Sequence, residues 1–150
     1  MKTIEEVLKQ VKPFKTKKRR ALINIVVSSN QLMDAMDEHL AQFSLTQKQF
    51  NVMRIVRGAK KGVSTLYIKK RMLVKNADAS RIVDRLVKKG YLEKCLHPDD
   101  KRLVQVSLSK EGDLLLKKID KSLDVLDDLL HALSDDECKT LNYLLNKIRS

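Results

Sequence analysis

Cysteine and histidine are scarce, and neither is arranged as a metal site. The two cysteines, Cys95 and Cys138, are too far apart in sequence to suggest a disulfide framework or a Cys-x-x-Cys metal motif. The three histidines are isolated from one another and lack the spacing of zinc ligands; they are His39, His97 and His131. We therefore expect a protein of the reducing cytoplasm that carries no metal and no cofactor.

Long apolar runs and catalytic motifs are also missing. No apolar run approaches the length of about 20 residues that a membrane-spanning helix needs. The first 20 residues have no signal-peptide core. There is no glycine-rich phosphate loop, no nucleophile elbow and no clustered pair of carboxylates. We therefore expect neither a membrane protein nor an enzyme.

Positive charge is abundant and unevenly distributed. The chain of 150 residues has a formal net charge of +12 at pH 7, which suggests a polyanionic partner. Residues 46–112 contain 17 basic and 6 acidic side chains, and residues 1–20 contain 8 and 2. By contrast, residues 21–45 contain 0 and 3, and residues 113–150 contain 6 and 8. This contrast predicts a DNA-docking module that is held by a neutral or acidic scaffold.

The most informative stretch is a predicted helix followed by a predicted hairpin. Residues 76–89 have apolar side chains at helical spacing, and Gly90 fits a left-handed helix end. Alternating residues in 91–96 and 103–108 predict two strands, joined by the polar loop 97–102 with a basic tip. A helix of this length, roughly 21 Å, can enter a DNA major groove while the loop reaches a neighbouring groove or the phosphates. The pattern predicts a winged helix-turn-helix.

The helix-turn-helix itself is predicted by capping residues. Thr46 and Gln49 form a capping box that opens one helix, and Ser64 can cap the next. Gly58 and Gly62 bracket the turn between them. We place the winged-helix DNA-binding module at about residues 46–112.

Both ends of the chain are predicted to be helical and apolar on one face. Residues 1–12 could form a short helix that ends at Pro13, and residues 17–42 predict a long one with a broad apolar stripe. Ser109 can cap a helix that runs to about residue 132, and a capping box from Ser134 to Glu137 opens a last helix. We expect residues 1–45 and 113–150 to be dimerisation helices of one domain, 1–150, whose fold is mainly α with a small β-hairpin wing.

The chain resembles the MarR family of winged-helix regulators. The family signature Asp-x-Arg, followed by x-x-x-Val-x-Leu-Thr-x-x-Gly, is matched by Asp100, Arg102, Val106, Leu108, Ser109 and Gly112. Serine replaces threonine at 109, and Leu103 stands where a small residue is more usual. Residues 80–90 also resemble the recognition helix of the family, and the order of elements is similar over about residues 20–148.

The resemblance implies a function as well as a fold. It implies a homodimer that binds double-stranded DNA through paired recognition helices and wings, often with a small molecule or an oxidant as the signal that releases DNA. We therefore expect a sequence-specific transcriptional regulator, a repressor, that binds a palindromic operator as a homodimer. A winged-helix module that binds a protein partner and no DNA is the alternative from another class.

The candidate DNA-contacting residues lie at the helix start and on the wing. Arg102 could enter the narrow minor groove or bind phosphate, or else pair with Asp99 or Asp100. Arg81 could donate to a guanine edge or a phosphate, or pair with an acid of the wing base. Asn76 could bind a base or cap the helix, and the lysines are phosphate candidates that could equally be ordinary exposed lysines. The full set is Lys75, Asn76, Ala77, Ser80, Arg81, Lys88, Lys101 and Arg102.

Two kinds of signal could act on such a regulator. An effector pocket between scaffold and DNA-binding module could be lined by Met33, Met36, Met53 and Tyr67, although methionines at helical spacing are more often core residues. Peroxide-sensing members of the resembled family use a cysteine near the chain start, and residues 1–94 contain none. A thiol switch at Cys95 or Cys138 is therefore disfavoured. Lys15 to Arg20 form a further basic cluster, and both a phosphate contact and a solvated helix end remain open for it.

Overall fold

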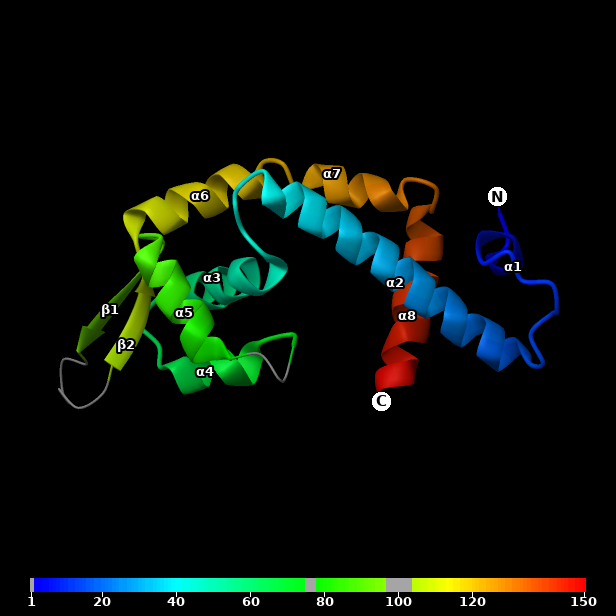
Figure 1. Cartoon of the computed structure of the whole chain (residues 1–150), viewed down its shortest axis with the longest axis horizontal. Coiled ribbons are helices and arrows are strands. Elements are labelled where there is room, and N and C mark those ends of the chain that lie inside the picture. The colour runs from blue at the N-terminus through cyan, green and yellow to red at the C-terminus, as the bar shows by residue number, and fades with distance from the viewer. Residues whose placement is uncertain (1, 75–77, 97–103) are drawn as a thin grey trace. The chain divides into compact units, whose positions relative to one another are not determined.

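The structure is a computed structural model that describes residues 2–74, 78–96 and 104–150, apart from the side chains of residues 125 and 126. Its contacts divide the chain into two compact units, Met1–His39 and Leu40–Ser150 (Figure 1). No helix in the described ranges is both long enough and apolar enough to cross a membrane.

The N-terminal unit contains a short helix and most of a long one, α1 (Ile4–Val7) and α2 (Lys17–Ala41). The prediction for α2 is confirmed, whereas α1 is much shorter than the predicted helix over residues 1–12. The reason is local, because Lys9 adopts a left-handed conformation with φ of 50°. The amide of Gln10 then donates back to the carbonyl of Glu5 at 2.9 Å, which closes the helix.

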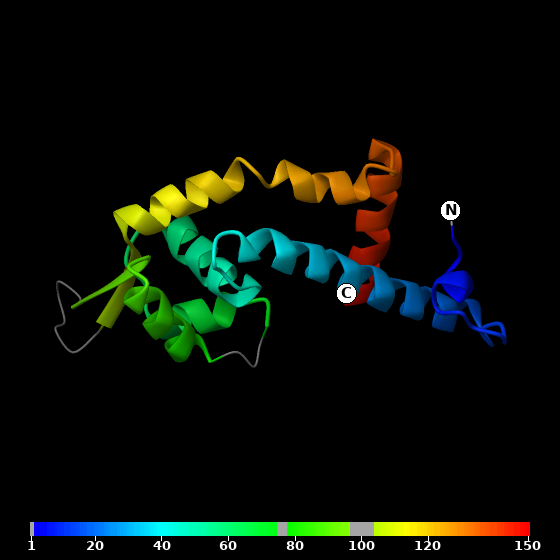
Figure 2. The ribbon, with the colours of Figure 1, turned by 45° about the horizontal axis from the view of Figure 1, so that its top comes forward.

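The second unit contains the predicted winged helix-turn-helix. Its elements are α3 (Gln47–Ala59), α4 (Thr65–Arg71), α5 (Ala79–Lys88), β1 (Leu92–Leu96), β2 (Val104–Leu108), α6 (Lys110–Asp120), α7 (Asp124–Asp127), the 3-10 turn η1 (Asp128–Leu130) and α8 (Asp135–Arg149). Helix α3 contacts α4, α5, α6 and β2, so these elements are gathered around it (Figures 1 and 2). The predicted fold class, mainly helical with one hairpin, is confirmed.

One apolar core holds this unit together. Its ten largest fully buried side chains come from α3, α4, α5, both strands, α6 and the end of α2. They are Leu40, Val52, Met53, Ile68, Val83, Leu86, Leu92, Val106, Leu116 and Ile119. Each contributes on the order of 1.5–3 kcal/mol by leaving water, so the core fixes how α5 and the hairpin sit on α3.

The predicted helix caps are confirmed. The side chains of Thr46, Ser64, Ser109 and Ser134 each accept a hydrogen bond from the backbone amide three residues later, at 2.9–3.4 Å. Such a cap stabilises a helix by about 1 kcal/mol, because it satisfies an amide that has no partner within the helix. Local side-chain chemistry therefore sets where α3, α4, α6 and α8 begin.

Two predicted helix boundaries are wrong. Helix α5 begins at Ala79 rather than at residue 76, because the Asp78 carboxylate caps it by accepting from the amide of Arg81 at 3.1 Å. The helix predicted from 110 to 132 is broken after Asp120. There the hydroxyl and the amide of Ser122 both donate to the carbonyl of Ile119, each at 2.9 Å, in place of the helical pattern.

Candidate nucleic-acid interface

Helix α5 has one buried face and one exposed face. Ala79, Val83 and Leu86 are at most 3% exposed, which confirms the predicted buried side. The opposite side is exposed and carries Ser80, Arg81, Asp84, Arg85 and Lys88. Three of these are basic and one is a hydroxyl, so the outward face of α5 can donate hydrogen bonds to phosphates and base edges.

Arg81 is highly exposed on this face. Its side chain is 81% exposed, and its Nε lies 3.1 Å from a carboxylate oxygen of Asp78. An exposed pair of this kind contributes at most about 1 kcal/mol, so Asp78 does not prevent Arg81 from binding a ligand. The sequence analysis gave an ion pair between Arg81 and an acid of the wing base as an alternative. In the structure Arg81 instead pairs with Asp78, the residue that caps α5.

The one acidic residue of the outward face is neutralised by the wing. Asp84 pairs with the ammonium of Lys94 on β1 at 2.6 Å. Arg85 has no ion pair within residues 78–96 or the other described ranges. The α5 surface is therefore basic overall, and the Asp84–Lys94 pair ties it to the wing.

The wing is a two-stranded antiparallel hairpin anchored at its base. Leu92 pairs with Leu108 at one end of the register and Leu96 with Val104 at the other. Val63, just before α4, forms a further two-bond bridge with Val106, with N···O distances of 3.0 and 2.8 Å. The wing base is thus fastened to the helix-turn-helix. Of the predicted contacts, Lys75, Asn76, Ala77, Lys101 and Arg102 lie outside the described residues.

Ser109 connects the exit of α5, the wing and α6. Its hydroxyl donates to the carbonyl of Gly90 at 2.6 Å and accepts from the amide of Gly112 at 2.9 Å, while its own amide donates to the carbonyl of Tyr91 at 3.1 Å. At Gly112 a Cβ atom would lie 2.2 Å from the carbonyl oxygen of Tyr91. Ser109 and Gly112, at two positions of the family signature, therefore have a structural role in joining the wing to α6. That role does not involve a contact with DNA.

An ion-pair cluster joins α3 to α6 in the same unit. The guanidinium of Arg57 contacts both carboxylate oxygens of Asp120, at 2.6 and 3.2 Å, and Arg54 approaches one of them at 3.6 Å. The hydrogen bonds from Arg57 hold the pKa of Asp120 below its ordinary value, and the positive charges of Arg57 and Arg54 lower it further. The sequence analysis missed this cluster, since α3 and α6 are far apart in the chain.

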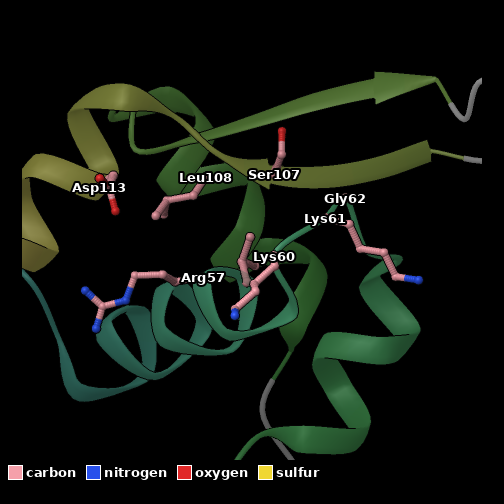
Figure 3. Close-up of a pocket in the computed structure, with 8 residues that line it drawn as sticks. Arg57, Lys60, Lys61, Gly62, Ser107, Leu108 and Asp113 are labelled. Atoms are coloured by element: carbon pink, nitrogen blue, oxygen red, sulfur yellow. The ribbon is translucent and has the colours of Figure 1, made fainter.

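A shallow cavity of about 280 Å³ lies between the C-terminal end of α3, β2 and α6. It is lined by Val56, Arg57, Lys60, Lys61, Gly62, Ser107, Leu108 and Asp113. Figure 3 shows the side chain of Lys61 directed away from Arg57 and Asp113. Arg57 is held by Asp120, and Asp113 pairs with Lys117 at 2.6 Å. Two of the four charged side chains of the lining, Arg57 and Asp113, are thus paired within the protein.

The four residues predicted to line an effector pocket are not part of this cavity. Met33 and Met36 lie on α2, where they are half-exposed and partly buried, respectively. Met53 is fully buried in the core of the second unit. The guanidinium of Arg71 lies over the ring of Tyr67, 3.6 Å from the ring centre. Met53 is therefore a core residue, which is the alternative to a ligand contact that the sequence analysis gave for methionines at helical spacing.

Comparisons with known proteins identify the class of this interface. The model of the MarR family matches residues 43–103, which include α3, α4, α5 and β1. The multiple antibiotic resistance protein MarR of Escherichia coli is 34% identical over 122 residues, which cover 79% of this chain and 84% of that protein. The transcriptional regulator PecS of Dickeya dadantii is 25% identical over 117 residues, 76% of this chain and 70% of PecS.

Solved structures agree with the sequence comparisons. A crystal structure of a MarR mutant from E. coli complexed with operator DNA matches with a TM-score of 0.74 and 31% identity, over 83% of this chain and 89% of that one. Another crystal structure of the same E. coli mutant matches with a TM-score of 0.70 and 28% identity, over 93% of this chain and 100% of that one. With its winged helix-turn-helix and the basic outward face of α5, the chain belongs to the MarR family of DNA-binding transcriptional regulators.

Proposed function

We propose that this protein is a repressor that binds a palindromic operator as a homodimer, with α5 in the major groove. The observation that carries the proposal is the outward face of α5, where Ser80, Arg81, Arg85 and Lys88 are exposed and Asp84 is neutralised by Lys94. The similarity to a MarR structure complexed with operator DNA supports DNA as the ligand.

Sequence reading is assigned to the first turn of α5. Ser80 and Arg81 are exposed there, and residues at the start of a recognition helix approach base edges in this class of module. Arginine can donate two hydrogen bonds to a guanine edge, and a serine hydroxyl can bind several bases. We extend the assignment to Asn76 and Ala77 just before the helix. Lys75, Lys88, Lys101 and Arg102 are assigned to phosphates and to the minor groove.

The homodimer is inferred from apolar side chains that face water. Helix α8 has 15 residues and none of them is buried, although Leu141, Leu144 and Ile148 are apolar and 38–66% exposed. Helix α2 likewise exposes a stripe made of Leu22, Ile25, Val26, Leu32 and Met33. Exposed apolar stripes of this length point to a protein partner, and a second copy of the chain would give the two-fold symmetry that a palindromic site requires.

Release by a small-molecule effector completes the proposal. Such a ligand would have to bind the DNA-free state more tightly than the DNA-bound state in order to weaken DNA binding. Met33, Met36 and Tyr67 have the partial exposure that a ligand contact requires, whereas Met53 would have to leave the core first. An oxidant signal through Cys95 or Cys138 is the alternative, and the exposed Cys95 is the more accessible thiol.

Selection of bound oligonucleotides from a random pool tests the proposal directly. We expect an enriched inverted repeat with half-sites about one helical turn apart, because two copies of α5 related by a two-fold axis would each read one half-site. A single half-site without an inverted copy would contradict the dimeric arrangement. Failure to enrich any duplex sequence would contradict sequence-specific binding.

A further inference from the structure

We propose that a second basic surface of this chain, distant in sequence from the winged helix, binds the phosphates of duplex DNA without reading its sequence. This basic arm is made of Lys9, Lys12, Lys15, Lys17, Lys18 and Arg19, all of them exposed. The proposal rests on the proposed function, since it adds a non-specific contact to a specific one. Its consequence is that affinity and specificity are carried by different parts of the chain.

The acids near the basic arm are already engaged. Glu5 binds Arg20 through two hydrogen bonds, from Nε at 2.8 Å and from Nη2 at 3.0 Å. The carboxylate of Glu6 accepts from the amide of Thr3 at 2.7 Å and so completes the cap of α1. Residues 7–33 contain no acidic residue at all. The positive charge of the basic arm is therefore left without a counter-charge in its own stretch of chain.

The position of these charges opposes the stability of α2. The first turn of α2 has no acidic residue and carries Lys17, Lys18, Arg19 and Arg20. A helix N-terminus has a positive dipole end, which acidic side chains stabilise and basic side chains destabilise. Among the described residues, Arg20 is the one cation of this turn with an ion-pair partner, Glu5. The other three cations repel each other and the helix end, and a polyanion laid against them would remove both repulsions.

Duplex DNA is the polyanion that fits best. It presents one negative charge per roughly 1.7 Å of helix axis, so several neighbouring lysines can each neutralise a phosphate and release a counterion. The winged helix of the same chain is the DNA-binding module of its family, which brings a duplex to the protein. A membrane surface would need an amphipathic helix to lie in it; α1 has only four residues, and the apolar stripe of α2 is assigned to the dimer. Val11, 97% exposed among the cations, is nevertheless the reason to include vesicles in the test.

The test compares two triple variants. One removes three positive charges from the basic arm, and the other removes three from elsewhere in the chain. The arm variant is Lys15→Gln, Lys17→Gln and Lys18→Gln in the full-length chain. The matched control is Lys121→Gln, Lys139→Gln and Lys147→Gln, which are also exposed and lower the net charge equally. Arg20 is kept in both because its pair with Glu5 is structural. Fluorescence anisotropy over a range of salt concentrations then gives the slope of log affinity against log salt, for a selected duplex and a random one.

For the arm variant we expect a slope shallower than that of the wild type by about 5, since a homodimer loses six phosphate contacts and each lost contact removes about 0.9. The loss should be equal on both duplexes, so that their affinity ratio stays unchanged. The thermal midpoint of the arm variant should be equal to or above that of the wild type, because the removed charges oppose the helix dipole. Weaker binding could then not be attributed to unfolding.

Three results would overturn the proposal. The slope of the arm variant could equal that of the wild type, or the control could lose as much slope as the arm variant, which would make net charge the cause. The arm variant could also lose binding to anionic phosphatidylserine vesicles while its DNA slope is unchanged, which would assign the arm to a membrane. In each case wild-type DNA binding still supports the proposed function. Absence of wild-type binding to any duplex would contradict both.

Discussion

The guanidinium of Arg57 on α3 holds the carboxylate of Asp120 on α6 through two hydrogen bonds, at 2.6 and 3.2 Å. The two residues are 63 positions apart in sequence, and their side chains are only 28% and 36% exposed. A two-bond contact between a guanidinium and a carboxylate fixes orientation as well as distance. This pair therefore sets how the last turn of α6 is attached to the winged-helix module.

Asp120→Asn should lower the free energy of unfolding by about 1 kcal/mol at pH 7, a modest value because solvent screens the partly exposed pair. The pKa of Asp120 is lowered by Arg57 in the folded state. The stabilisation is therefore complete above the unfolded-state pKa of about 3.9 and is lost as pH falls through the lower folded-state pKa. Urea unfolding of both proteins from pH 7 to pH 3 should show the difference shrinking only below about pH 4. A difference that stays constant to pH 3 would contradict the role of the carboxylate charge.

Gly112→Ala should destabilise the protein by about 1–3 kcal/mol, because the new Cβ would lie 2.2 Å from the carbonyl oxygen of Tyr91 and the backbone would have to move. The matched control is Gly58→Ala. Gly58 lies within α3, and a Cβ added there would have no atom of another part of the chain within 4 Å. That control should be neutral or stabilising by about 0.5–1 kcal/mol. Thermal denaturation measures both, and equal midpoints for the two variants would refute the close approach.

Leu141→Glu together with Leu144→Glu should dissociate the proposed homodimer, because two carboxylates would be placed on the apolar stripe of α8. Light scattering coupled to size exclusion should then give the mass of one 17.3 kDa chain, where the wild type gives twice that mass. Asn146→Glu adds a charge on the other side of the same helix and should leave the dimer intact. A wild type that is already monomeric, or a double variant that stays dimeric, would exclude α8 from the interface.

The parts of the fold that could be predicted are those set by neighbours in sequence. The caps at Thr46 and Ser64 depend on residues within three positions, and the buried face of α5 follows from helical spacing. The break after Asp120 was missed because Leu123 and later apolar residues keep the helical spacing, while the competing hydrogen bonds of Ser122 leave no mark on that pattern. The start of α5 was misplaced because several polar residues before it could equally well cap a helix.

The candidate site was predictable in part for the same reason. Periodicity correctly placed Arg81 and Lys88 on the exposed side of α5, and two alternating runs joined by a polar loop predicted the wing. Periodicity could not give the partners of charged residues across the fold, such as Lys94 for Asp84 or Asp120 for Arg57. Those pairs depend on how elements distant in sequence pack, which the spacing of apolar residues does not encode.

The central claim is that the outward face of α5 binds duplex DNA, and anisotropy of wild type and Arg81→Ala on a selected duplex tests it most directly. We predict that wild-type affinity falls steeply as salt increases. Loss of the arginine contact should weaken binding roughly 5- to 150-fold at fixed salt, the equivalent of about 1–3 kcal/mol. Arg149→Ala, which removes another exposed charge, from the end of α8, should change little. Wild-type protein that binds no duplex at low salt, or Arg81→Ala that binds the selected duplex as tightly as the wild type, would contradict the claim.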